Sequence, residues 1–202
     1  AVSVFEAEVY YFYPLADWQM NKDNLIQLFQ SVLPMSTGKA EQLAEKFRPR
    51  EIARNEYLLK EGAVGSESHF IEEGMIRSYI YDLDGNEVTT AFYSKNMFAS
   101  DLLSYFKRTH SKEYIQALVD CETWYITYED MQGSFHTIPE FREFGRLNII
   151  NHYGILKQRM LSMLQETAEQ RYANLINSNP EILQNAPLKY IASYLGITDT
   201  SL

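Results

Sequence analysis

The hydrophobic pattern of the chain changes near residue 138, from short β-type runs to a long helical repeat. Before that point, runs rich in β-branched and aromatic residues are separated by glycines. These runs are residues 57–59, 70–71, 76–81, 87–93, 114–119 and 123–128. Asp84-Gly85 lies between two of them and predicts a hairpin, because a tight turn there needs a positive φ. Short strands at regular spacing with glycine turns predict a small barrel or sandwich.

Two short helices are predicted before the strands. Apolar residues recur at helical spacing from Asn21 onward, and Pro34 ends that run. Ser36-Thr37 offers an N-cap for a second helix, which Pro49 closes.

The first nineteen residues alternate in character and are rich in aromatic side chains. They fit an edge strand, a partner-docking segment or a non-native leader, and we expect a peripheral role for them. They lack the basic segment and apolar block of a secretory signal. No apolar run in the chain approaches the ~20 residues that span a bilayer, so a membrane partner is not expected.

Apolar residues between Pro139 and Asn179 step by three or four, which predicts one long helix over residues 138–179. Gly145 and Gly154 interrupt this helix only mildly. It is longer than a typical helix of roughly 8–20 residues, so its apolar seam is expected to contact a second chain. The alternative is a long helix packed wholly within one monomer. The expected dimer seam consists of Ile149, Tyr153, Leu156, Met160 and Met163.

The C-terminal region, residues 180–202, has the skeleton of a helix-turn-helix. Pro180 breaks the preceding helix, and Pro187 can open a short amphipathic one. A small residue four positions before a glycine lets two helices approach around a tight turn. An ordinary helical hairpin is the alternative. The residues expected to form the DNA-binding head are Ala192, Gly196, Thr198, Thr200 and Ser201.

Charge is unevenly distributed along the chain. The formal net charge of -9 argues against a nucleic-acid partner when it is taken whole. Residues 61–137, however, hold five lysines and arginines against thirteen aspartates and glutamates, a net charge of -8. The helical flanks are close to neutral. Whole-chain charge therefore does not decide whether those flanks contact DNA.

Several kinds of site are not expected in this chain. Its single cysteine, Cys121, excludes an intrachain disulfide and any multi-cysteine zinc or iron–sulfur site. The histidines have no paired ligand spacing, so no metal or haem cofactor is expected. They are His69, His110, His136 and His152. No catalytic triad, phosphate loop or carboxylate pair stands out, so we do not expect an enzyme.

A pattern of strands ending in glycine resembles the Crp/Fnr family of bacterial transcription regulators. It consists of Leu-Leu-Lys-Glu-Gly at 58–62, Phe-Ile-Glu-Glu-Gly at 70–74, Asp-Gly-Asn-Glu at 84–87 and Tyr-Ile-Gln-Ala at 114–117. The sequences of residues 169–172 and 191–198 are similar to those of Bacteroidetes-type members of the family. The resemblance implies an α+β chain with a cyclic-nucleotide-binding-type β-roll (a double-stranded β-helix, jelly-roll-like) within residues 20–137. A dimerisation helix and the start of a winged helix-turn-helix would follow.

The same resemblance places a degenerate ligand pocket in the roll, formed by Phe98, Ser100, Asp101, Ser111 and Lys112. Nucleotide-binding members have Gly-Glu where this chain has Ser100-Asp101, and an arginine for the cyclic phosphate where it has Ser111. Losing that guanidinium removes a contact worth about 1.5–3 kcal/mol. Glu113 adds repulsion toward an anion. Tight cyclic AMP binding is therefore not expected. We expect that the pocket binds a different effector or no effector.

The function implied by the resemblance is a cytoplasmic, homodimeric transcription regulator. An unidentified small effector would modulate sequence-specific binding of its two heads to promoter DNA. This interpretation requires a recognition helix beyond Leu202, because one helix of the motif cannot read bases. The alternative is a small-molecule or protein-binding sensor that acts without DNA.

Overall fold

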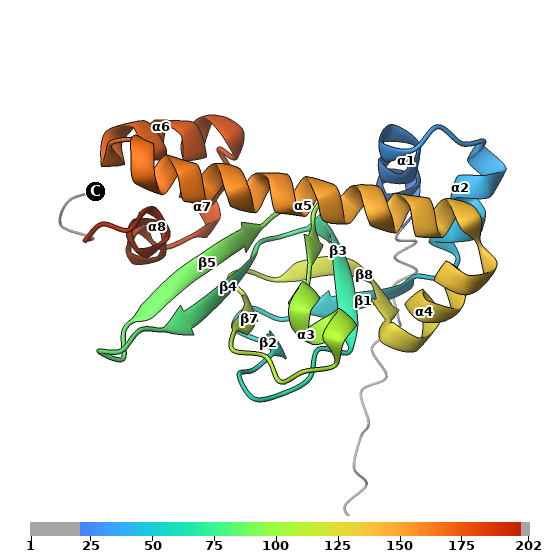
Figure 1. Ribbon diagram of the computed structural model, residues 1–202, viewed down its shortest axis with the longest axis horizontal. Coiled ribbons are helices and arrows are strands. Elements are labelled where there is room, and N and C mark those ends of the chain that lie inside the picture. Colours follow the sequence, from blue (N-terminus) through green and yellow to red (C-terminus); the bar gives the residue numbers. More distant parts are fainter. Residues whose placement is uncertain (1–20, 199–202) are drawn as a thin grey trace, which may run out of the picture.

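The computed structural model describes residues 21–198. It shows a β-roll with one long helix laid across it and further helices at both ends of that helix (Figure 1). The segment 1–19 lies outside the described residues, as do Thr200 and Ser201 of the expected DNA-binding head.

The roll consists of eight strands in two sheets. They are β1 (Arg48–Ile52), β2 (Tyr57–Leu59), β3 (Glu67–Glu73), β4 (Ile76–Tyr81), β5 (Glu87–Tyr93), β6 (Phe98–Ala99), β7 (Tyr114–Ala117) and β8 (Cys121–Thr127). One sheet has the order β1-β8-β3-β6 and the other β2-β7-β4-β5. Neighbouring strands are antiparallel throughout. The predicted α+β class and β-roll are confirmed.

Strands β4 and β5 form the hairpin predicted from Asp84-Gly85. Gly85 has a φ of 81°. The Asp82 carboxylate accepts hydrogen bonds from the backbone N–H groups of Asp84, at 3.0 Å, and Asn86, at 2.8 Å. The turn is thus set by local chemistry that the sequence displays.

Strand β1 was not predicted, because Pro49 and the charges around it argue against a strand. The proline is tolerated because β1 is the edge of its sheet and pairs only with β8. Two predicted strands also have different limits: the run 114–119 ends at Ala117 and the run 123–128 begins at Cys121.

The predicted N-terminal helices are present as α1 (Asp23–Val32) and α2 (Thr37–Ala44). Ser36 caps α2, its side chain accepting a hydrogen bond from Lys39 N–H. Two further helices were not predicted, α3 (Leu102–Lys107) between β6 and β7, and α4 (Tyr128–Thr137) directly after β8. An aromatic cluster joins the N-terminal helices to the roll and to the start of the long helix.

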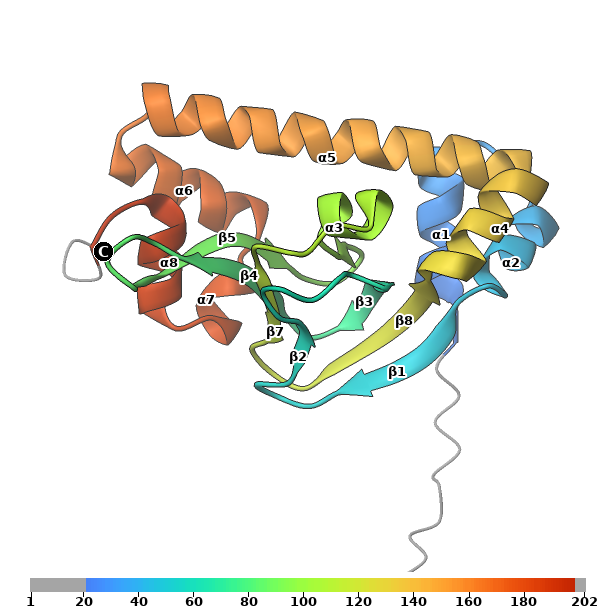
Figure 2. The ribbon, with the colours of Figure 1, turned by 60° about the horizontal axis from the view of Figure 1, so that its bottom comes forward.

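The long helix is shorter than predicted. Helix α5 (Pro139–Gln165) stops before Glu166, which has an extended backbone, and α6 (Ala168–Ser178) is a separate helix. The prediction of one helix reaching Asn179 is therefore wrong. Thr167 and Gln170 form a capping box that starts α6, and this local signal ends the periodic run. Helix α6 turns back beside the last turns of α5 (Figures 1 and 2).

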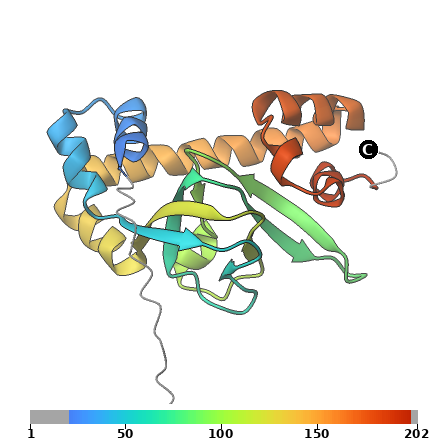
Figure 3. The ribbon, with the colours of Figure 1, turned by 180° about the vertical axis from the view of Figure 1, so that it is seen from behind.

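The last described helices, α7 (Ile182–Asn185) and α8 (Leu188–Leu195), pack on the hairpin side of the roll (Figures 2 and 3). Ile182, Ile191 and Leu195 from these helices share one buried cluster with Met75 and Phe92 of the roll. The C-terminal helices therefore rest on the roll. None of the helices within residues 21–198 is long and apolar enough to cross a membrane.

Candidate functional site

Asp101 and Ser111, two of the predicted pocket residues, are brought together by the fold. Asp101 follows β6 and caps α3, one carboxylate oxygen accepting from Leu103 N–H at 3.0 Å and Ser104 N–H at 3.1 Å. Its other oxygen accepts from the Ser111 hydroxyl at 2.8 Å. Both oxygens of Asp101 are thus already engaged within the protein. These bonds use most of the acceptor capacity of this carboxylate.

The other three predicted pocket residues do not join this pair. Lys112 is exposed, in keeping with the opposite orientation of adjacent residues along an extended chain. Phe98 and Ser100 are buried, and the Phe98 ring packs with Phe70 and Phe144 between the roll and α5. These two residues line an apolar cavity rather than an anion site.

Glu113 lies half-buried beside the same carboxylate. Burial raises its pKa, and the nearby Asp101 charge acts in the same direction. Hydrogen bonds to Thr90 and Ser78, together with the Arg159 charge, oppose that shift. Two carboxylates therefore stand where the resemblance implies a phosphate pocket, and they disfavour an anionic ligand.

Arg159 of α5 is a residue that sequence reasoning missed. Its guanidinium donates to the backbone carbonyls of Thr90 and of Thr89 (3.3 Å) on β5, and to the Tyr194 carbonyl (3.1 Å) on α8. It also lies 4.0 Å from the centre of the Tyr194 ring. Burial lowers the pKa of Arg159, an arginine that remains charged at neutral pH. One side chain thus joins the long helix, the roll and α8. Nothing in the sequence marks it, because Arg142, Arg146 and Lys157 lie on the same helix.

A second arginine lies beneath α8. Arg77 of β4 is only 1% exposed, and its guanidinium carbon is 3.4 Å from the ring centre of Tyr190 and 4.1 Å from that of Tyr79. It pairs with Glu87 at 2.5 Å. The stack on Tyr190 ties α8 to β4 through a desolvated cation–π contact.

Helix α8 is also hydrogen-bonded to β5. The Ser193 hydroxyl accepts from the backbone N–H of Thr89 at 3.2 Å and donates to the Thr89 hydroxyl at 3.0 Å. These bonds and the two arginine contacts make up what we call the α8–roll interface. Its residues are Arg77, Thr89, Arg159, Tyr190, Ser193 and Tyr194.

The predicted dimer seam lies on one face of α5 and is exposed. Tyr153 is 63%, Leu156 64% and Met160 55% exposed, and Ile149 and Met163 are each 43% exposed. The described part of the chain does not cover this face. Met163 also has a contact within the chain, because its side chain packs closely against Gly196.

The expected head is described only as far as Thr198. Ala192 is buried, and its carbonyl accepts from Ile197 N–H at 3.0 Å. Gly196 ends α8 with a φ of 69°, the left-handed conformation that glycine adopts without strain. Helix α8 thus ends in a glycine at the predicted position, and the helix-turn-helix itself stays a prediction.

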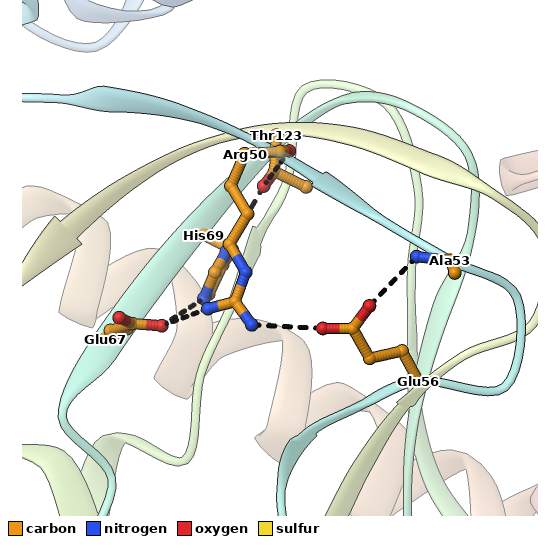
Figure 4. A network of polar contacts seen from close by, with 6 residues as sticks. All are labelled: Arg50, Ala53, Glu56, Glu67, His69 and Thr123. Atoms are coloured by element: carbon orange, nitrogen blue, oxygen red, sulfur yellow. Dashed lines mark hydrogen bonds and ion pairs between the residues drawn. The ribbon is translucent and has the colours of Figure 1, made fainter. Parts of the chain in front are cut away.

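His69 illustrates the structural use of histidine in this roll (Figure 4). Its ring nitrogens contact the Glu67 carboxylate and the Thr123 hydroxyl, each at 3.2 Å, and Arg50 binds the same carboxylate at 2.7 Å. Burial lowers the pKa of His69, whereas Glu67 acts to raise it. The hydrogen bond from His69 is the main cause of the lowered pKa of Glu67. Within residues 21–198, no three His, Cys, Asp or Glu side chains are grouped as metal ligands would be.

Comparison with known families agrees with the β-roll fold. Residues 49–137 match the family model of the cyclic nucleotide-binding domain. These residues have the fold of that domain. No curated protein sequence matches the chain.

Solved structures share the fold at low sequence identity. The c-di-GMP-responsive global regulator CLP of Xanthomonas campestris is 11% identical, with a TM-score of 0.63 over 82% of this chain and 87% of that one. FixK2 of Bradyrhizobium japonicum is 15% identical, with a TM-score of 0.63 over 77% and 80%. The Thermus thermophilus catabolite activator protein is 17% identical, with a TM-score of 0.54 over 86% and 82%. In each case the covered share of this chain is larger than residues 49–137.

Proposed function

We propose that this chain is the sensor and dimerisation part of a Crp/Fnr-type transcription regulator of the bacterial cytoplasm, which binds DNA as a homodimer. The observation that carries the proposal is the exposed apolar face of α5 next to a helix, α8, that ends in a glycine turn. An apolar seam of this length is unfavourable in water unless a partner covers it. A second copy provides a matching seam and sets two heads at a fixed spacing.

Cyclic AMP is not the effector in this proposal. The charges of Asp101 and Glu113 lie close enough to interact, and Asp101 already accepts a hydrogen bond from Ser111. An anionic phosphate placed there would meet two carboxylates without an arginine from the roll.

We propose that the protein works by a shift between two states, one with α8 docked on the roll and one with α8 released from it. In the docked state, Arg159 links α5 to β5 and α8, and the α8–roll interface holds the first head helix on the hairpin. An effector that moves α5 relative to the roll would weaken these bonds. The heads would then be free to take the spacing that DNA requires.

The seam is tested by Met160→Glu, which places a carboxylate in the middle of the expected interface. Sedimentation velocity of the wild-type chain should show a dimer, and the variant should dissociate at least 100-fold more readily, since two unpaired charges would be buried. Lys157→Glu, a change on an exposed neighbour of the same helix, is the control. An unchanged mass for Met160→Glu would contradict the seam.

The alternative function, a sensor that acts through proteins, draws support from the net charge of -8 on residues 61–137. The two functions are separated by selecting ligands for the full-length gene product from a random DNA library. Enrichment of a two-fold symmetric sequence supports the regulator. Failure to enrich any sequence, with a dimer still present, supports the sensor.

A further inference from the structure

Four tyrosines from three strands form a connected cluster on the sheet β2-β7-β4-β5. Tyr57 lies on β2, Tyr79 and Tyr81 on β4, and Tyr114 on β7. The Tyr79 and Tyr114 rings are stacked with their centres 5.0 Å apart, and the Tyr57 and Tyr79 hydroxyls are 3.2 Å apart. The rings therefore hold one another in place on one face of the sheet.

Two of these rings reach the surface, and we call Tyr81 and Tyr114 the exposed tyrosine pair. Tyr81 is 47% exposed and Tyr114 is half-buried. Their ring centres are 5.6 Å apart and their planes lie at 84° to each other. Tyr79 contacts both rings and is only 1% exposed, so it supports the pair from within the protein. Tyrosine rings that are fixed in this way are typical of the residues that contribute most to protein interfaces.

The rest of the cluster shows which side chains its rings accept. The Arg77 guanidinium carbon lies 4.1 Å from the centre of the Tyr79 ring, and the Lys60 amine lies 4.9 Å from the centre of the Tyr57 ring. Within residues 21–198, no lysine or arginine lies over either ring of the exposed tyrosine pair. The two rings that face solvent thus lack the cation that each of the other two already has.

Carboxylates adjoin the exposed tyrosine pair. The Tyr114 hydroxyl donates to the Glu61 carboxylate at 3.4 Å, and Asp82 follows Tyr81 in the chain and is exposed. Neither Glu61 nor Asp82 forms an ion pair with another residue of the described range 21–198. The segment 61–137 has a net charge of -8, so its field also attracts cations and repels anions.

The chemistry of these groups favours a guanidinium on a large partner. A planar guanidinium can stack on a ring while its N–H groups donate to a carboxylate, whereas an ammonium is a compact and strongly hydrated charge. One exposed contact of this kind changes an affinity only about two- to fivefold. That is too little to hold a free small cation, so the arginine must belong to a chain that makes further contacts beside it.

We propose that the exposed tyrosine pair is a docking site for an arginine side chain on an exposed segment of a partner protein. The guanidinium stacks on the Tyr81 ring, and the Glu61 and Asp82 carboxylates attract it. This contact needs neither DNA nor an effector, so it goes beyond the proposed function. An assay without DNA therefore separates a failure of this site from a failure of the regulator.

The test is fluorescence polarisation of the chain 1–202 with a short labelled peptide of alternating arginine and glycine. The same peptide with lysine in place of arginine carries the same charge and measures the effect of charge alone. The arginine peptide should bind saturably and about fivefold more tightly than the lysine peptide, because only the guanidinium combines stacking with directed hydrogen bonds. Equal binding of the two peptides, or no saturable binding of either, would overturn the site.

Variants of the chain locate the contact. Tyr81→Leu should lower the affinity for the arginine peptide about fivefold, to that of the lysine peptide, whereas Tyr81→Phe keeps the ring and should leave the affinity unchanged. Tyr125→Leu, the same change at a half-buried tyrosine of the other sheet, is the control and should have no effect. Glu61→Gln should weaken both peptides.

Circular dichroism checks that each variant is folded. Tyr81→Thr, which also suits a strand, replaces Tyr81→Leu if that variant is not folded. Unchanged affinity for the arginine peptide in the folded variant without the Tyr81 ring would overturn the docking site, as would an equal loss in Tyr125→Leu.

Discussion

Replacing Arg159 with methionine should loosen α8 from the roll while leaving the roll intact. The guanidinium donates to three backbone carbonyls, two on β5 and one on α8. Each hydrogen bond from a charged donor contributes about 1.5–3 kcal/mol. The desolvation of a mostly buried guanidinium offsets several kcal/mol of this gain. Methionine retains the apolar packing but none of the bonds, so the net loss at the α8–roll interface should be about 2 kcal/mol.

Hydrogen exchange measured by mass spectrometry checks this loss directly. A loss of about 2 kcal/mol corresponds to roughly 30-fold faster exchange for amides that open with α8. Amides of β1 and β8, on the other sheet, should keep their protection. Arg146→Met is the matched control, because Arg146 is exposed on the same helix and its ion pair within residues 21–198 is with Glu143, three residues away. Unchanged protection of α8 in Arg159→Met, or equal loosening in the control, would refute the reasoning.

Three further predictions concern pH, the head turn and the ligand. Burial lowers the pKa of His69, so as pH falls through about 6.5 the unfolded state takes up the proton more readily than the folded state. Urea denaturation should therefore show the free energy of unfolding decreasing from pH 7 to 5, with a flatter dependence in His69→Gln. Gly196→Ala should lower the free energy of unfolding by about 1–2 kcal/mol in the same assay, because the φ of this glycine is 69° and a Cβ would lie 2.7 Å from Met163 Cε. Gly154→Ala, on the open surface of α5, should not lower it. Calorimetry with cyclic AMP and cyclic GMP should show no micromolar binding, and a saturable heat would contradict the acidic pocket.

Local signals explain what the sequence could predict. The turn at Asp84-Gly85 and the cap at Ser36 depend on neighbouring residues alone, and both are present in the structure. The end of α5 was missed although its signal is equally local. Thr167 and Gln170 have the spacing of a capping box, but the apolar steps on either side of them continue the helical period.

The contacts that define the site depend on tertiary placement and could not be predicted in this way. Asp101 and Ser111 were both assigned to a pocket, but their hydrogen bond to each other depends on how α3 closes over the loop. Arg159 finds its acceptor on α8 only because α6 turns back and brings α8 onto β5. No periodicity in the chain specifies that return.

The most direct test of the proposed regulator is a fluorescence-polarisation titration of the full-length protein against the DNA sequence that selection yields. The account predicts dimeric binding at least 1,000-fold tighter than to scrambled DNA of the same length and salt. Met160→Glu should abolish that preference without unfolding the roll. Equal affinity for selected and scrambled DNA, in a protein that is folded and dimeric, would contradict the account.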